Sequence, residues 1–206
     1  QAVSAIDKSG VSPNTVSLPR GPGSIEGLGE AFAPLLSNGT GKYAVGLWVP
    51  PGPAGHAPTL SLRYDGGNGN SSLGLGWRLD LPFVQRRTYK GIPRYVDAAN
   101  GIDDDGDGET DDADEVDVFV DSDAEELVPV ANADGIHTDY FRRHESTFVR
   151  YRRLESGWEG RLPDGTYLEF GVTAAGRLAD GARVWRWLLE RAADPRGNTI
   201  LFLYHS

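Results

Sequence analysis

The residues best suited to chemistry lie in one acidic stretch, NGIDDDGDGETDDADE, at residues 100–115. Aspartates alternate there around Gly108, which falls at the position where the backbone of a calcium-binding loop turns sharply. Aligned with that loop, the stretch supplies six candidate ligands: Asp103, Asp105, Asp107, Glu109, Asp111 and Asp114. Glu109 would contribute its main-chain carbonyl, and Asp114 stands where a longer glutamate is usual.

The local charge favours a bound divalent cation. Residues 97–126 contain 15 of the 30 acidic residues and none of the 20 basic ones. Carboxylates this crowded repel one another, and Ca²⁺ accepts six to eight oxygens in irregular cages, whereas Zn²⁺ prefers His or Cys. We therefore expect one structural Ca²⁺ with a dissociation constant on the order of 10⁻⁴–10⁻³ M. The alternative is an acidic loop neutralised only by solvent.

Composition excludes several other functions. The chain of 206 residues has no Cys, so it has no disulfide framework, thiolate nucleophile or cysteine zinc site. Outside residues 97–126, 15 acids face 20 bases, and no basic groove with interleaved aromatics suggests a nucleic-acid partner. No run of 18 apolar residues predicts a membrane span. The four histidines lie in separate segments, and no nucleophile motif or cofactor loop accompanies them, so we expect no enzyme activity.

The elements that would position the acidic loop are strands. Apolar residues alternate in KYAVGLWVP (42–50) and PTLSLRYD (58–65), which a Pro/Gly loop joins as an antiparallel pair. Further alternating segments follow at residues 76–89, 116–121, 126–131, 138–145, 147–155, 162–171 and 183–206. Pro82 makes the first of them an edge strand or marks the end of a strand. The last of these predicts two strands across the turn DPRGN, because Trp185, Trp187 and Leu189 repeat at period two.

These patterns predict an all-β, mostly antiparallel fold, either a sandwich or barrel-like, with the calcium loop set between strands. Residues 1–16 are predicted to be a flexible lead, and residues 17–206 to form the β domain. One short helix is expected near Gly29–Leu36, between glycine turns. Because the chain ends within an apolar strand, LFLYHS, we expect it to be one piece of a longer polypeptide.

Several motifs resemble one protein family. They are SLPRGPGSIEGLGEAF (17–32), YDGGNGNSSLGLGW (64–77), KGIPRY (90–95), DVFVDSDAEELVPV (117–130) and WRWLLERAADPRGNTILFLYH (185–205). The chain is similar over nearly all of residues 16–206 to the SpvB-type N-terminal domain. This domain opens a Salmonella virulence-plasmid protein, the B component of insecticidal toxin complexes and related Rhs/YD-repeat proteins. In that pattern PRY runs almost directly to DVF, so residues 97–115 resemble an inserted calcium loop.

The resemblance implies a scaffold. In toxin complexes such domains help to build a hollow β shell around a toxic C-terminal cargo, and the transferase of the virulence protein lies in a separate domain. We therefore expect a non-enzymatic building block of a secreted or surface bacterial toxin, whose partners are the rest of its own polypeptide or other toxin-complex subunits. The alternative is a calcium-dependent module that binds carbohydrate or another surface. Exposed tryptophans beside Asp103–Asp114 would favour the alternative, and buried tryptophans would favour the scaffold.

Overall fold

The computed structural model describes residues 33–35, 40–67, 69–71, 73–89, 91–97, 101–103, 106–110, 116–131 and 138–205. Within these ranges the chain is built from antiparallel strands, with one short 3₁₀ turn, η1 (Pro53–Gly55). The predicted lead, residues 1–16, lies outside the described residues. No helix in the described part of the chain is long and apolar enough to cross a membrane.

The first unit is a four-stranded sheet in the order β1-β2-β3-β6. Its strands are β1 (Ala33–Leu35), β2 (Thr40–Leu47), β3 (Leu60–Asp65) and β6 (Trp77–Leu79). A small hairpin of β4 (Asn70–Ser71) and β5 (Gly74–Leu75) lies between β3 and β6 in the chain. The register pairs Val45 with Leu62 and Leu62 with Leu79, as the alternation of the sequence predicts.

The two sides of this sheet differ in character. One side carries apolar residues of β2, β3 and β6: Tyr43, Val45, Leu47, Leu60, Leu62, Tyr64, Trp77 and Leu79. The other side carries the ion pairs Lys42–Asp65 and Arg63–Asp80 at its margin. Within β2, β3 and β6, no described residue is fully buried, and Leu47 and Leu79 are 37 and 38 % exposed.

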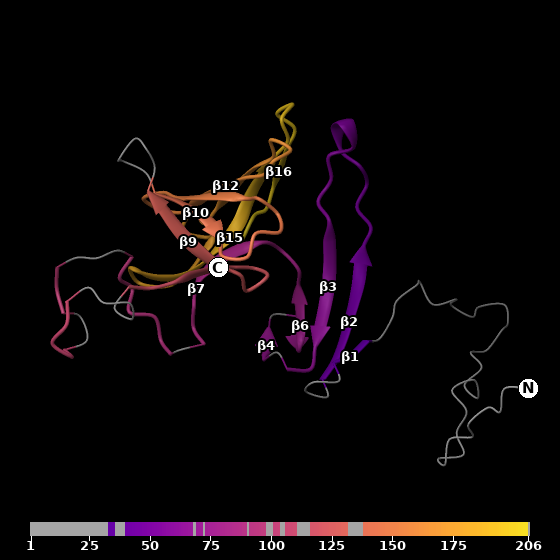
Figure 1. Cartoon of the computed structure of the whole chain (residues 1–206). Coiled ribbons are helices and arrows are strands. Elements are labelled where there is room, and N and C mark those ends of the chain that lie inside the picture. Colours follow the sequence, from indigo (N-terminus) through magenta and orange to yellow (C-terminus); the bar gives the residue numbers. More distant parts are fainter. Residues whose placement is uncertain are drawn as a thin grey trace, which may run out of the picture.

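The second unit is a closed ring of eight strands. Its order is β13-β12-β11-β10-β9-β8-β7-β15, and β15 pairs back with β13. The ring strands are β7 (Phe83–Arg86), β8 (Phe119–Asp121), β9 (Glu126–Ala131), β10 (Thr138–Arg142), β11 (Arg150–Arg153), β12 (Trp158–Arg161), β13 (Tyr167–Phe170) and β15 (Arg183–Ala193). Figure 1 shows this barrel beside the four-stranded sheet. The barrel-like form of the expected all-β fold is thereby selected over the sandwich.

The strand β15 closes the ring because it is long enough to pair with several strands along its length. It runs for 11 residues, with Trp187 opposite Val84 of β7 and Leu189 opposite Phe170 of β13. Two further strands, β14 (Arg177–Asp180) and β16 (Thr199–Leu201), extend β15 outside the ring. The β15–β16 hairpin turns at residues 194–198, where the backbone N–H groups of Arg196 and Asn198 donate to the Asp194 carboxylate.

The barrel interior holds the aromatic core. Trp158 is fully buried and contacts Phe119 at a ring-centroid distance of 4.8 Å and Tyr140 at 4.9 Å, both edge to face. Trp187, which is 1 % exposed, lies 6.1 Å from Trp158. Each such edge-to-face pair stabilises the fold by about 0.5–1.5 kcal/mol beyond the contribution from burying the rings. The strand predicted from the period-two repeat is present, and Trp187 and Leu189 on it are buried.

One expected element is wrong. The helix predicted near Gly29–Leu36 is, in its described part, the strand β1, which pairs Pro34 with Gly41 of β2. The strand lies at the edge of its sheet, where a proline without an N–H group is tolerated. Proline has no N–H group to donate in a helix interior, so Pro34 disfavours the predicted helix. The same residue is compatible with the edge strand.

Candidate metal site and its attachment to the barrel

The acidic excursion leaves and re-enters the barrel at a single point. The Asp117 backbone N–H donates to the Val96 carbonyl at 2.8 Å. The Asp117 carboxylate in turn accepts from the backbone N–H groups of Arg94 (2.9 Å) and Tyr95 (2.6 Å). These contacts join the two stems, residues 94–97 and 116–118, into a neck, and the candidate metal ligands lie between the stems in the sequence.

Two arginines, the buried Arg86 and the partly buried Arg153, hold this neck on the barrel. Arg86, whose side chain is 5 % exposed, contacts Asp117 at 2.8 Å and Asp97 at 2.5 Å, and its Nε donates to the Val184 carbonyl. Arg153 contacts the other oxygen of Asp97 at 3.2 Å. Burial lowers the pKa of Arg153, and the charge of Asp97 opposes that shift. The carboxylates of both stems therefore neutralise arginine side chains of the barrel wall.

The described part of the loop is folded around its first predicted ligand. The Asp103 carboxylate accepts from the backbone N–H groups of Gly106 (2.5 Å) and Gly108 (3.0 Å), and Asp107 accepts from Glu109 N–H at 2.8 Å. Gly106 and Gly108 have φ of 79° and 98°, a backbone region that favours glycine. The sharp turn that the sequence predicts at Gly108 is therefore present.

The six predicted ligands divide into two groups. Asp103, Asp107 and Glu109 are described, the first half-buried and the other two exposed, whereas Asp105, Asp111 and Asp114 lie outside the described residues. Among the described residues, no group of three or more His, Asp or Glu side chains is arranged to hold a metal. The calcium site thus stays a prediction, supported so far by the turn around Asp103.

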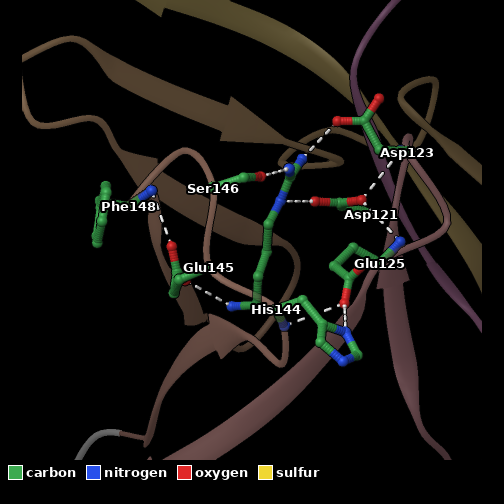
Figure 2. Close-up of polar contacts among 8 residues, drawn as sticks. Asp121, Asp123, Glu125, His144, Glu145, Ser146 and Phe148 are labelled. Atoms are coloured by element: carbon green, nitrogen blue, oxygen red, sulfur yellow. Dashed lines mark hydrogen bonds and ion pairs between the residues drawn. The ribbon is translucent and has the colours of Figure 1, made fainter.

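A second acidic turn, Asp121–Glu125, uses an arginine as its cation. Arg142 Nε donates to Asp121 at 2.6 Å, and Arg142 Nη2 contacts Asp123 at 2.6 Å (Figure 2). The Arg142 and Asp121 side chains are 8 and 1 % exposed. Burial raises the pKa of Asp121, against the charge of Arg142 and hydrogen bonds from the backbone N–H groups of Asp123 and Glu125.

The loop after β10 completes this cluster. The Glu145 carboxylate accepts from the backbone N–H groups of Arg142 (2.9 Å) and Phe148 (2.8 Å), while the ring of His144 lies 2.7 Å from Glu125 (Figure 2). The hydrogen bond from His144 lowers the pKa of Glu125. Every acid in this turn has a described partner, so the cluster is a structural joint between the β8–β9 and β10–β11 connections.

Sequence reasoning missed the arginines that hold the neck. The available signal is the alternation in FVQRR, residues 83–87, where Val84 and Arg86 share the inward side of β7 and are both buried. An arginine at an inward strand position predicts a buried carboxylate partner. That partner comes from residues 97 and 117, at the two ends of the acidic stretch.

The comparison with known families gives a direct assignment. A family model described as Salmonella virulence plasmid 65kDa B protein, SpvB, matches residues 36–206. The chain belongs to the SpvB family. It is 31 % identical over 168 residues to the mono(ADP-ribosyl)transferase SpvB of Salmonella typhimurium strain 14028s. The aligned region covers 73 % of this chain and 27 % of that protein. The SpvB protein of Salmonella dublin matches to the same extent. The chain thus spans about a quarter of the length of these curated relatives.

Solved structures with the same fold are longer chains than this one. The crystal structure of TcdB2-TccC3 matches with a TM-score of 0.66 and 30 % identity, over 95 % of this chain and 10 % of that one. A Tc holotoxin pore from Photorhabdus luminescens matches with a TM-score of 0.67 and 30 % identity, over 94 % of this chain and 9 % of that one. The N-terminal domain of the effector SpvB from Salmonella typhimurium matches with a TM-score of 0.54 and 27 % identity, over 73 % of this chain and 51 % of that one. The resemblance and the all-β class expected from the sequence are confirmed.

Proposed function

We propose that this chain is a non-enzymatic structural domain of a longer secreted or translocated toxin polypeptide of the Rhs/YD-repeat type. It contributes strands to a β shell around a C-terminal cargo, and its acidic loop binds Ca²⁺. The proposal draws on the SpvB family assignment and on the similarity to Tc toxin chains, of which this fold forms about a tenth. The enzymatic payload of such a polypeptide would reside outside these residues.

The observation that carries the scaffold role is the apolar side of the four-stranded sheet. Its eight apolar residues come together by cross-strand pairing, yet none of those described in β2, β3 and β6 is fully buried. Soluble proteins seldom leave so contiguous an apolar surface without a partner. In a chain that spans about a quarter of its curated relatives, the partner we propose is the remainder of its own polypeptide.

Cysteine labelling tests this assignment directly, because the chain has no native Cys. Leu47→Cys reports on the apolar side of β2. Gly46→Cys is the matched control on the opposite side, where an added Cβ meets nothing within 4 Å. In the 206-residue chain both cysteines should react with a maleimide. In the longer polypeptide Leu47→Cys should be protected while Gly46→Cys stays reactive, and equal reactivity of Leu47→Cys in both forms would refute the scaffold role.

The calcium proposal rests on the register of the aspartates and on the turn around Asp103. Asp103 and Asp107 already accept hydrogen bonds from three backbone N–H groups of the loop, which holds both carboxylates at the turn where a cation would bind. The neck confines both ends of the loop, which limits the ordering entropy that binding must overcome. Bound Ca²⁺ would supply the positive charge that the sequence of residues 97–126 lacks.

Titration calorimetry after EGTA treatment tests the calcium site. One site with a dissociation constant on the order of 10⁻⁴–10⁻³ M is expected. Asp103→Asn combined with Asp107→Asn should abolish the binding heat. Asp164→Asn, a change at an exposed turn aspartate elsewhere, should leave the heat intact. Absence of heat and of any thermal shift in the unmodified chain at about 10 mM Ca²⁺ would reject the site, whereas the scaffold role would stand.

The alternative function, a calcium-dependent carbohydrate module, is not favoured by the tryptophans. Trp158 and Trp187 are core residues of the barrel. Trp48 is 83 % exposed, but it directly follows β2 of the four-stranded sheet, whereas Figure 1 shows the described part of the acidic loop on the other side of the barrel. No tryptophan platform therefore accompanies Asp103–Glu109 in the described structure.

A further inference from the structure

A polar cavity lies where the ends of β7 and β11 meet the start of β15. Its volume is about 370 Å³, and its lining includes three arginines, two aromatic rings and two carboxylates: Arg86, Arg153, Arg177, Tyr95, Trp187, Asp97 and Glu155. A water molecule occupies about 30 Å³ of liquid, so the space admits a group of several non-hydrogen atoms. The arginines make this cavity suited to a negatively charged guest.

The three arginines are not equally neutralised. Arg86 is satisfied by Asp97, Asp117 and the Val184 carbonyl. Arg153 shares Asp97 and also donates to the carbonyls of residues 154 and 157. Arg177 donates only to the Gly171 and Val172 carbonyls, and no ion pair joins it to a carboxylate among the described residues. Glu155 also lines the cavity, but its side chain is exposed and no ion pair joins it to Arg177 among the described residues.

Two lining side chains also have donors without acceptors. Arg153 Nε and Trp187 Nε1 are buried and make no hydrogen bond, and they are two of the three such side-chain atoms in the described part of the chain. Leaving a buried donor unpaired costs about 1–3 kcal/mol, so an acceptor in the cavity would relieve that cost. Burial also lowers the pKa of Arg153, a shift that a nearby negative charge would oppose.

We infer that this cavity binds an oxyanion, a carboxylate or phosphate group, next to Arg153 and Arg177. An oxyanion supplies an ion-pair partner for Arg177 and acceptor lone pairs for the unpaired N–H donors. A planar guanidinium suits both chemical groups because it can donate two parallel hydrogen bonds. Water alone would pair the donors but would form no ion pair with Arg177.

The direct test is titration calorimetry of the 206-residue chain with phosphate, acetate and citrate at constant ionic strength, with chloride as the reference anion. Saturable binding of phosphate alone would assign a phosphate site, and binding of acetate or citrate alone a carboxylate site. Either result supports an oxyanion site. If none of these anions binds better than chloride, the cavity holds water and the proposal is overturned.

Two variants locate the binding. Arg177→Gln should weaken it about tenfold, which corresponds to one charged hydrogen bond, while Arg196→Gln, an equal charge change at an exposed turn residue, should not. Ala182→Glu places a tethered carboxylate at the cavity lining without altering any arginine, so it should abolish binding and raise the melting temperature. Equal affinity in Arg177→Gln and Arg196→Gln, or unimpaired binding in Ala182→Glu, would overturn the assignment even if one variant failed to fold.

Discussion

The four-stranded sheet and the barrel carry the same alternation of apolar and polar residues but put it to different use. In the barrel the inward apolar residues include Trp158 and Phe170, which are almost inaccessible to solvent. In the sheet, Leu47 and Leu79 have more than a third of their surface exposed. The difference is closure. The barrel strands meet again through β15, while the sheet ends at the edges β1 and β6. Alternation alone therefore predicts which side of a strand is apolar, but not what covers that side.

Truncating the barrel core should give the largest effect. Trp158→Ala removes the ring that contacts Phe119, Tyr140 and Trp187. We expect a loss of about 3–5 kcal/mol in the free energy of unfolding, measured by urea denaturation. Trp48→Ala, at an exposed position, is the control and should change stability little. Similar losses for both variants would show that the barrel is not the stable unit.

Removing the cation of the Asp121–Glu125 turn should be the next largest effect. Arg142→Met leaves the Asp121 carboxylate buried without a counter-charge, so a loss of about 3 kcal/mol is expected. The neighbouring Arg143→Met is a matched control, because Arg143 pairs with Glu126 at the exposed surface and should contribute less than about 1 kcal/mol. Adding Asp121→Asn to Arg142→Met should recover part of the loss. Failure to recover would argue against a buried charge as the cause.

Equivalent leucines in the two regions should differ. Leu127→Ala in β9 should cost about 2–5 kcal/mol because the side chain is buried in the barrel core. Leu62→Ala in β3 should cost about 1 kcal/mol or less in the 206-residue chain, since the described residues bury its side of the sheet only in part. The same urea titrations measure both. A large loss for Leu62→Ala would mean that the apolar side is already packed within this chain.

Alkaline pH should have the smallest effect that can be assigned to one residue. Burial, and then the charge of Glu190, raise the pKa of Tyr204 to about 12, and its hydroxyl donates to the Leu189 carbonyl of β15. Because the folded-state pKa exceeds the ordinary value of 10.0, this contribution is complete below pH 10 and is lost as the pH rises towards 12. Tyr204→Phe should flatten the fall in stability over that interval, whereas Tyr89→Phe at an exposed position should not.

The sequence was sufficient where the structure depends on neighbouring residues. The pairing of Val45 with Leu62 follows from period two and one intervening loop, and the turn at Gly108 follows from residue type. The prediction also placed the end of a strand at Pro82, and the structure adds that the chain crosses there from β6 of the sheet to β7 of the barrel.

Long-range features could not be predicted from local pattern. Closure of the ring depends on β15 pairing with β7, about a hundred residues earlier in the chain, and nothing within VWRWLLERAA encodes that partner. The ion pairs of Arg86 with residues 97 and 117 likewise join separate segments of the chain, so local pattern does not predict them. Half of the candidate metal ligands, Asp105, Asp111 and Asp114, lie outside the described residues, so for these the sequence remains the sole guide.

The backbone hydrogen bond between Asp117 and Val96 has a practical consequence. This hydrogen bond holds the two ends of the excursion together, so the segment between them does not have to span a distance. Lengthening that segment would therefore increase the entropic cost of loop closure only slowly. Relatives of this fold could gain or lose residues at this position without disturbing the strand register around it. The same position would accept an epitope or a fluorescent reporter, provided that residues 97 and 117 are kept to hold Arg86.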